Sequence, residues 1–140
     1  MKKHTISIDT KYFEPIRKGQ ISLLIFNKKI LNENEVDYIE AQKGGYSVIA
    51  KIEKCYVKSF GEITDEEARE AGFLNKDFLK DELIRRFKID TLDQLLNRLD
   101  EYLFFLVKVS KKDEKSTLFD DIKINVYDTT SELYDIWRYD

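Results

Sequence analysis

Cysteine and histidine are almost missing from this sequence of 140 residues, which contains one of each. Because Cys55 has no second cysteine, no disulfide can form within the chain, and with His4 as the single histidine a cysteine–histidine zinc cluster is excluded. A thiol nucleophile normally needs a histidine base, so we interpret Cys55 as a packed strand residue. The sequence therefore predicts no metal site and no bound cofactor.

Long apolar runs and proline are also scarce. No apolar run of 18 residues occurs, the chain has one proline, and its charged start, Met1 to His4, leads into an alternating pattern instead of a secretory segment. Hydrophobic residues make up 42% and charged residues 36% of the chain, which suits a packed globule rather than a disordered chain. We expect one domain, in the cytoplasm and without a membrane segment.

Charge is unevenly distributed along the chain, whose net charge is -3. Residues 1–58 contain 11 Lys and Arg against 7 Asp and Glu, whereas residues 59–140 contain 13 against 20. Phosphate binding depends on local positive potential, so the first segment is the candidate polyanion-binding part. An ordinary solvated charge distribution explains the same numbers.

Alternating and continuous apolar patterns predict strands in the first sixty residues. The expected strands are His4 to Asp9, Gln20 to Lys28, Val36 to Ala41 and Tyr46 to Tyr56, the last two joined by a hairpin at Gly44-Gly45. A helix from Lys11 to Lys18, capped by Asp9 or Thr10 and ended by Gly19, should separate the first two strands. Pro15 should keep this helix short.

After residue 60, the spacing of the apolar residues changes from that of strands to that of helices. Capping boxes at Thr64 to Glu67 and Thr91 to Gln94, with a cap at Asn75, predict a helical insert whose apolar stripes face the core: Phe78, Leu79, Leu83 and Phe87, then Leu95, Leu96 and Leu99. A strand at Tyr102 to Val109 follows, and a short strand at Ile122 to Tyr127 and a last helix form a C-terminal extension. The predicted class is α+β with a mainly antiparallel sheet or small barrel.

Three segments resemble the ASCH domain family of the PUA-like superfamily. The segment Y-F-E-P-I-R-K-G, residues 12–19, resembles the first ASCH helix, and S-F-G-E-I-T-D-E-E-A-R-E-A-G-F, residues 59–73, resembles the stretch after the central strands. The strand at Tyr102 to Val109 lies where the closing strand is expected. The resemblance implies a PUA-like β-barrel, which binds RNA in many relatives and hydrolyses a modified nucleoside in some. It divides the chain into an ASCH/PUA-like domain, residues 1–110, and an acidic C-terminal extension, residues 111–140, packed on the same domain.

The signature of ASCH domains, G-x-K-x-x-E/T-x-R, begins at the glycine that ends the first helix. Gly19 is kept, but the Lys, Glu/Thr and Arg positions hold Ile21, Leu24 and Phe26. A hydrolase needs a base or a nucleophile beside its substrate, and these side chains cannot supply one. We therefore assign no catalytic residue and do not expect an enzyme. The apolar replacements either fill the family's cleft or turn it into a hydrophobic surface for a protein partner.

The first functional hypothesis is a non-catalytic module that binds RNA or single-stranded nucleic acid in a regulatory role. Its candidate binding residues are Lys11, Arg17, Lys18, Lys28, Lys29, Tyr46 and Lys54. The cations would contact phosphates, and Tyr46 and Tyr56 could stack on unpaired bases. Lys51 and Lys54 have opposite strand parity, so they share a face only if a bulge intervenes. Solvated lysines and core-facing tyrosines explain each residue singly.

Two alternatives remain open. One is a protein-interaction or inhibitor module that uses the apolar cleft or the acidic C-terminus, where residues 113–140 hold three basic and eight acidic residues. Aromatic anchors occur there at Tyr127, Tyr134, Trp137 and Tyr139, although docking of the last helix on the domain explains the same pattern. The other is a hydrolase of modified nucleosides, for which Glu53, Glu62 and Asp65 supply carboxylates without a matching nucleophile and base.

Overall fold

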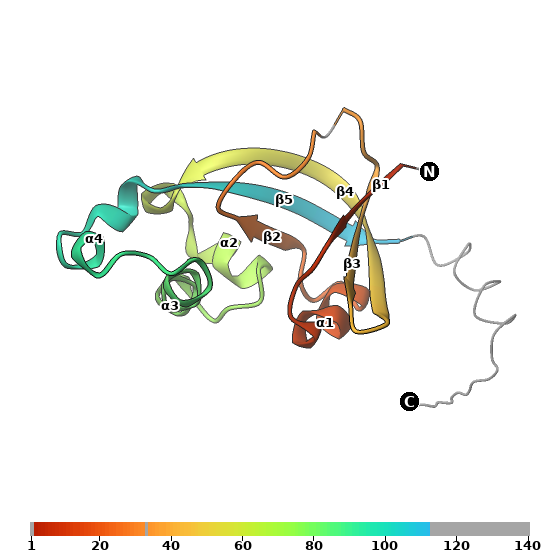
Figure 1. Ribbon diagram of the computed structural model, residues 1–140, viewed down its shortest axis with the longest axis horizontal. Helices are drawn as coiled ribbons and strands as arrows, with labels where there is room; N and C mark the ends of the chain where they lie inside the picture. The colour runs from red at the N-terminus through yellow and green to blue at the C-terminus, as the bar shows by residue number, and fades with distance from the viewer. Residues whose placement is uncertain (1, 33, 113–140) are drawn as a thin grey trace, which may run out of the picture.

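Five strands form one sheet in the computed structural model, which describes residues 2–32 and 34–112 (Figure 1). The strands are β1 (Lys3–Ile6), β2 (Leu23–Phe26), β3 (Tyr38–Lys43), β4 (Tyr46–Ser59) and β5 (Leu103–Lys111). Their order in the sheet is β1-β3-β4-β5-β2, and every pairing is antiparallel except that of β1 with β3. The predicted α+β class with a mainly antiparallel sheet is confirmed.

The helices lie between β1 and β2 and between β4 and β5. They are α1 (Phe13–Arg17), α2 (Asp65–Glu70), α3 (Lys76–Phe87) and α4 (Thr91–Leu95), with 3-10 turns η1 (Thr10–Tyr12), η2 (Phe60–Glu62) and η3 (Arg98–Glu101). Helices α2 to α4 form the predicted insert (Figure 1). Within the described ranges no ladder joins the edge strands β1 and β2, so a closed barrel is not seen. The strand and helix expected after residue 116 lie outside the described residues.

The segment between β1 and β2 is helical but short, as its proline predicts. Asp9 Oδ1 accepts a hydrogen bond from the Lys11 amide at 3.0 Å and so caps η1. Pro15 lies in the first turn of α1, where the missing N–H removes no helical hydrogen bond. Gly19, at φ 77°, takes the left-handed conformation that ends the helix and turns the chain toward β2. None of the helices in residues 2–32 and 34–112 has the length and apolar character needed to cross a bilayer.

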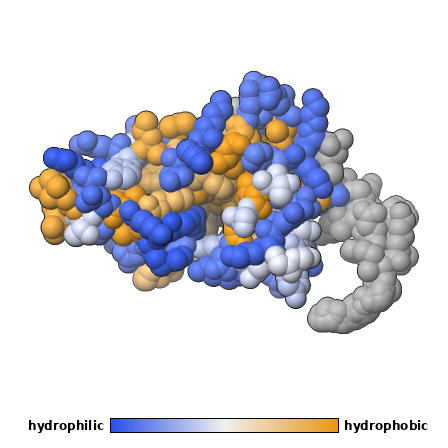
Figure 2. Space-filling model, viewed as in Figure 1, coloured by the Kyte–Doolittle hydropathy of each residue, from blue (hydrophilic) through white to orange (hydrophobic). Residues whose placement is uncertain are grey.

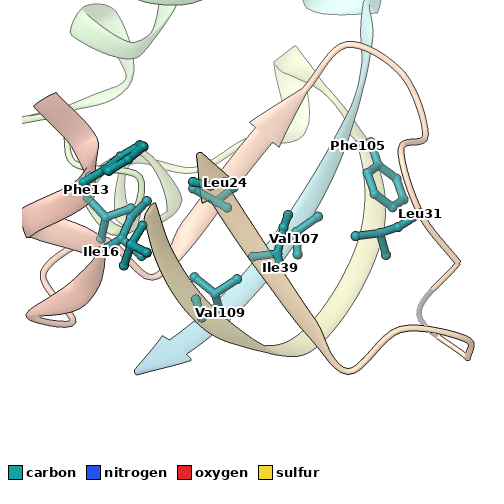
Figure 3. Close-up of a cluster of buried hydrophobic side chains, with 12 residues drawn as sticks. Phe13, Ile16, Leu24, Leu31, Ile39, Phe105, Val107 and Val109 are labelled. Atoms are coloured by element: carbon teal, nitrogen blue, oxygen red, sulfur yellow. The ribbon is translucent and has the colours of Figure 1, made fainter. Parts of the chain in front are cut away.

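Each face of the sheet buries an apolar cluster. One cluster packs α1 against the sheet (Figure 3), and its members include Phe13, Ile16, Leu24, Ile39, Phe105, Val107 and Val109. The other packs the insert against the opposite face, and its members include Leu23, Ile25, Ala68, Leu79, Leu83, Phe104 and Leu106. The edge strand β2 is therefore buried on both faces, as its near-continuous apolar run predicts.

A β-bulge interrupts the pairing of β4 with β5 between Ile52 and Lys54. One extra residue in a strand reverses the alternation of the side chains beyond it. Lys51 pairs with Ser110 and Lys54 pairs with Lys108, which are two residues apart on β5, so both lysines lie on one face of the sheet. The bulge that Lys51 and Lys54 need in order to share a face is therefore present.

Glu67 fastens the helical insert to β4. Its carboxylate accepts hydrogen bonds from the Tyr56 hydroxyl, at 2.6 Å, and from the Lys58 ammonium, at 2.8 Å. It also accepts one from the Thr64 amide, at 3.0 Å, while Thr64 Oγ1 accepts one from the Glu67 amide, which completes the predicted capping box. Burial alone would raise the pKa of Glu67, but the hydrogen bonds from Lys58, Tyr56 and Thr64 lower it to about 2.

We expect Glu67→Gln to destabilise the fold. The amide removes the charge opposite Lys58 and leaves one acceptor oxygen for several donors, so the free energy of unfolding should fall by roughly 2–4 kcal/mol. Urea denaturation measures this loss. Glu66→Gln, at the exposed neighbouring position, is the matched control and should leave the free energy of unfolding nearly unchanged. Equal stability of the two variants would contradict the role assigned to Glu67.

The stabilisation from Glu67 should also depend on pH in a defined direction. The pKa of its carboxyl is about 2 in the folded protein against an ordinary 4.5, so the unfolded state binds the proton more tightly. The contribution is complete above about pH 4.5 and is lost as the pH falls toward about 2. Urea unfolding of the wild-type protein and Glu67→Gln at a series of pH values should therefore show a difference in free energy that shrinks over that interval. A difference that does not change with acidification speaks against this linkage.

Candidate functional site

A pocket of about 490 Å³ opens between β2, the C-terminal half of α3 and the segment that joins β1 to η1. Its apolar lining residues include Ile8, Ile21, Leu24, Phe26, Phe73, Leu79 and Phe87. On the face shown in Figure 2, apolar side chains near the middle of the molecule are bordered by hydrophilic ones. The volume and the mixed lining are typical of a ligand-binding pocket.

The three signature positions all contribute to this pocket. Ile21 and Leu24 are 5% and 9% exposed and belong to the core as well as to the pocket wall, and Phe26 is half-buried. Ile21 and Leu24 are thus largely packed into the core, and the half-buried Phe26 adds apolar surface to an open pocket.

Glu82 organises one wall of the pocket. The Tyr12 hydroxyl donates to Glu82 Oε2 at 3.0 Å, and Arg85 Nη2 lies 2.9 and 2.8 Å from Oε1 and Oε2. Burial alone would raise the pKa of Glu82, but hydrogen bonds from Arg85, Tyr12 and Arg86 outweigh it and hold the pKa below its ordinary value. Glu82 is therefore charged at neutral pH and engaged by three side chains, which suits an anchor better than a general base.

Arg86 ties α3 to the other walls of the pocket. Its guanidinium lies 5.5 Å from the ring centroid of Tyr12 and 5.7 Å from that of Phe87. Arg86 also donates to Glu82 Oε2 at 3.1 Å, to the Tyr12 hydroxyl at 3.1 Å and to the Ile25 carbonyl at 3.4 Å. A planar guanidinium can lie flat on a ring and direct its donors outward in a fixed fork, whereas a lysine ammonium is a compact charge without that geometry.

The rim of the pocket carries an excess of positive charge. The lining includes four cationic side chains, Lys43, Arg85, Arg86 and Lys88, and two acidic ones, Asp9 and Glu82, which leaves a net charge of +2. Arg85 and Arg86 both pair with Glu82. Within the described part of the chain, the ammonium groups of Lys43 and Lys88 have no hydrogen-bond or ion-pair partner. A ligand anion at the pocket would therefore meet two cations that are not already neutralised.

None of the residues predicted from the sequence to bind nucleic acid lines this pocket. Three of them lie on η1 and α1 or directly after it: Lys11 Nζ is 5.2 Å from the ring centroid of Tyr12, whereas Arg17 and Lys18 pair with Glu14. Surface pairs of this kind contribute little stability, but they reduce the positive potential that α1 offers to a phosphate.

The other predicted binding residues are spread over the molecule. Lys28 and Lys29 are exposed after β2, and Tyr46 is 70% exposed at the start of β4. Lys54 lies on the sheet face opposite to α1, because its partner Lys108 alternates with buried residues of the α1 cluster. The sheet therefore separates Lys54 from the α1 cations, whereas Tyr46 lies on the α1 face, two residues before Val48 of the α1 cluster.

Tyr56 makes contacts through both its hydroxyl and its ring. The ammonium groups of Lys54 and Lys58 lie 5.2 and 5.8 Å from the ring centroid. Burial and the hydrogen bond to Glu67 raise the pKa of the Tyr56 hydroxyl. Stacking of a base on this ring would have to displace the lysines, so the side chain serves the attachment of the insert.

Three of the four cations that line the pocket come from the end of α3, a helix whose apolar stripe the sequence assigns to the core. Arg85, Arg86 and Lys88 close α3, and basic side chains at a helix C-terminus also complement the helix dipole, so they carry no distinct signal. A clue existed in the sequence: three cations lie within four residues beside an apolar stripe. Within residues 2–32 and 34–112, no group of three or more His, Cys, Asp or Glu side chains is placed to hold a metal ion.

We expect Arg86→Lys to weaken the attachment of α3 to β2 and η1. Lysine cannot replace both the stacking on Tyr12 and the hydrogen bonds to the Tyr12 hydroxyl and the Ile25 carbonyl, so the free energy of unfolding should fall by about 1–2 kcal/mol. Arg85→Lys is the matched control, because the Arg85 side chain is 64% exposed, and its urea midpoint should stay near that of the wild-type protein. Equal midpoints for the two variants would show that Arg86 does not hold the pocket walls together.

Comparison with known proteins finds a likeness in fold. No family model matches the sequence, and no curated protein matches it. The structure is similar to the crystal structure of protein EF3133 from Enterococcus faecalis V583, described under the family model DUF984, with a TM-score of 0.51 and 14% sequence identity. The match covers 71% of this chain and 69% of that one. At this identity the likeness shows a shared α+β fold and carries no activity with it.

Proposed function

We propose that this protein is a non-catalytic PUA-like module that binds RNA or single-stranded DNA and takes an unpaired base into the pocket beside β2. The observation that carries the proposal is the combination of an open apolar lining with a net charge of +2 on the rim. The fold likeness and the ASCH-like segments at residues 12–19 and 59–73 support it, because PUA-like scaffolds include RNA-binding modules.

The apolar lining suits a nucleobase. Phe26, Phe73 and Phe87 present aromatic surface, and recognition of single strands relies on bases that stack on aromatic side chains. The base would leave its phosphates at the rim, where the lining cations lie. The proposal assigns the phosphate contacts to the cations that line the pocket, in place of the residues on η1 and α1, after β2 and on β4 that the sequence predicts.

The non-catalytic part of the proposal is supported by the three signature positions. Ile21, Leu24 and Phe26 have no group that transfers protons or attacks a substrate. Glu82 is a carboxylate at the pocket, but its hydrogen bonds hold its pKa low and fix its oxygens.

A protein partner that inserts an apolar side chain is the second candidate, and the apolar lining favours it equally. The cationic rim separates the two candidates. Four cations against two acidic groups suit a phosphate chain, whereas a purely apolar anchor gains nothing from them.

The experiment is a fluorescence anisotropy titration of labelled single-stranded RNA and DNA hexamers at low salt. We expect binding that weakens as salt rises, since phosphate contacts release counterions. Phe26→Leu keeps an apolar side chain and loses the stacking surface, so it should weaken binding by roughly 1 kcal/mol, about fivefold.

Phe78→Leu is the matched control for this substitution. Phe78 also lies on a regular element, is 53% exposed and does not line the pocket, so binding should be unchanged. An absence of binding to every hexamer at low salt would remove the proposed function and leave the protein partner as the candidate. Equal losses for Phe26→Leu and Phe78→Leu would place the nucleic acid elsewhere on the molecule.

A further inference from the structure

Lys88 has a backbone conformation that lysine rarely adopts. It follows α3 as its C-terminal cap, at φ 52° and ψ 53°, in the left-handed region. Glycine is the usual residue here because it has no Cβ to crowd the backbone, and asparagine is the usual substitute. Asn97 is the other non-glycine residue with positive φ in the described ranges, and it fits that rule. Lys88 does not.

The side chain at this strained position lines the pocket. It is exposed, and its ammonium has no partner in the described part of the chain. Backbone strain that no internal contact of the side chain offsets is typical of a position that serves binding. The ammonium at this place is therefore open to an anion from outside the chain.

Lys43 is a second exposed lysine at the pocket, on another element and in ordinary strand conformation. It is the last residue of β3, directly before the Gly44-Gly45 turn, and its exposed side chain also lines the pocket. The ends of β3 and α3 belong to elements on either side of β2 in Figure 1. Arg85 and Arg86 differ from both lysines, because Glu82 already neutralises them in part.

We propose that Lys43 and Lys88 bind the backbone phosphates on the two sides of the base held in the pocket. This inference rests on the proposed function and adds to it the groups that hold the strand. Each lysine offers three donors and a full charge to a phosphodiester oxygen. The aromatic lining would hold the base, and the two lysines would fix the direction in which the strand enters and leaves.

Lys88→Gly separates binding from folding, because it should weaken the binding of nucleic acid while it stabilises the fold. Removal of the crowded Cβ should raise the urea midpoint, while loss of the ammonium removes one phosphate contact. For a single strand, the slope of log K against log salt should then become shallower by roughly 0.7 for the hexamer. Lys43→Gln should give a similar change in slope, and the double variant about twice that change.

Two further variants keep the outcome clear. Asn97→Gly relieves the same kind of backbone conformation away from the pocket, so it should raise the midpoint and leave the slope alone. Lys88→Arg keeps the charge and should keep the wild-type slope. If the hexamer binds but Lys88→Gly and Lys43→Gln keep the wild-type slope, the phosphate assignment is wrong while the proposed function stands. If the wild-type protein binds no hexamer at low salt, both fall together.

Discussion

The position of the helical insert depends on one buried carboxylate. Glu67 serves the N-terminus of its own helix and two side chains of β4, so α2 cannot shift without leaving charged and polar groups unpaired. The other end of α2 is fixed too, because the Ser22 amide donates to the Glu70 carbonyl at 2.8 Å. Helix α2 thereby joins β4 to the start of β2, which flank β5 on its two sides. The wall that α3 gives the pocket follows from this attachment.

The apolar residues at the signature positions are consistent with this attachment. Ile21 lies where α2 ends, and a Cβ on Gly72, at φ 98°, would stand 3.1 Å from its side chain. With 5% exposure at Ile21, an ammonium or guanidinium there would lose its hydration without an acidic partner. The close packing of the insert therefore requires an apolar side chain at position 21, and that side chain in turn fills the space beside α2.

The sequence predicts the positions of the helices and strands better than it predicts which of their faces are buried. Alternation, the capping box at Thr64 and the cap at Asn75 locate the strands and the insert, because these signals act within a few residues. The capping box predicted at Thr91 to Gln94 is wrong, because Asp90 caps α4 by accepting a hydrogen bond from the Leu92 amide. The insert's stripes are less well predicted: Leu79 and Leu83 are buried, but Phe78, Leu95 and Leu96 are 53%, 75% and 50% exposed. The pocket joins residues from the segment after β1, from β2, from the end of β3 and from α3, whose proximity is set by tertiary packing. No local pattern in a single sequence contains that information.

The net charge of the chain does not attract a polyanion over long distances, so recognition of nucleic acid has to come from direct contacts. Residues 113–140 hold three basic and eight acidic residues, which leaves 21 basic and 19 acidic residues, a net charge of +2, for residues 1–112. Screening at physiological salt acts over about 8 Å, so a net charge this small does little to steer association. Two unneutralised lysines at the mouth of a pocket act within that distance. Their contribution is local, and it depends on the left-handed turn that places Lys88 there.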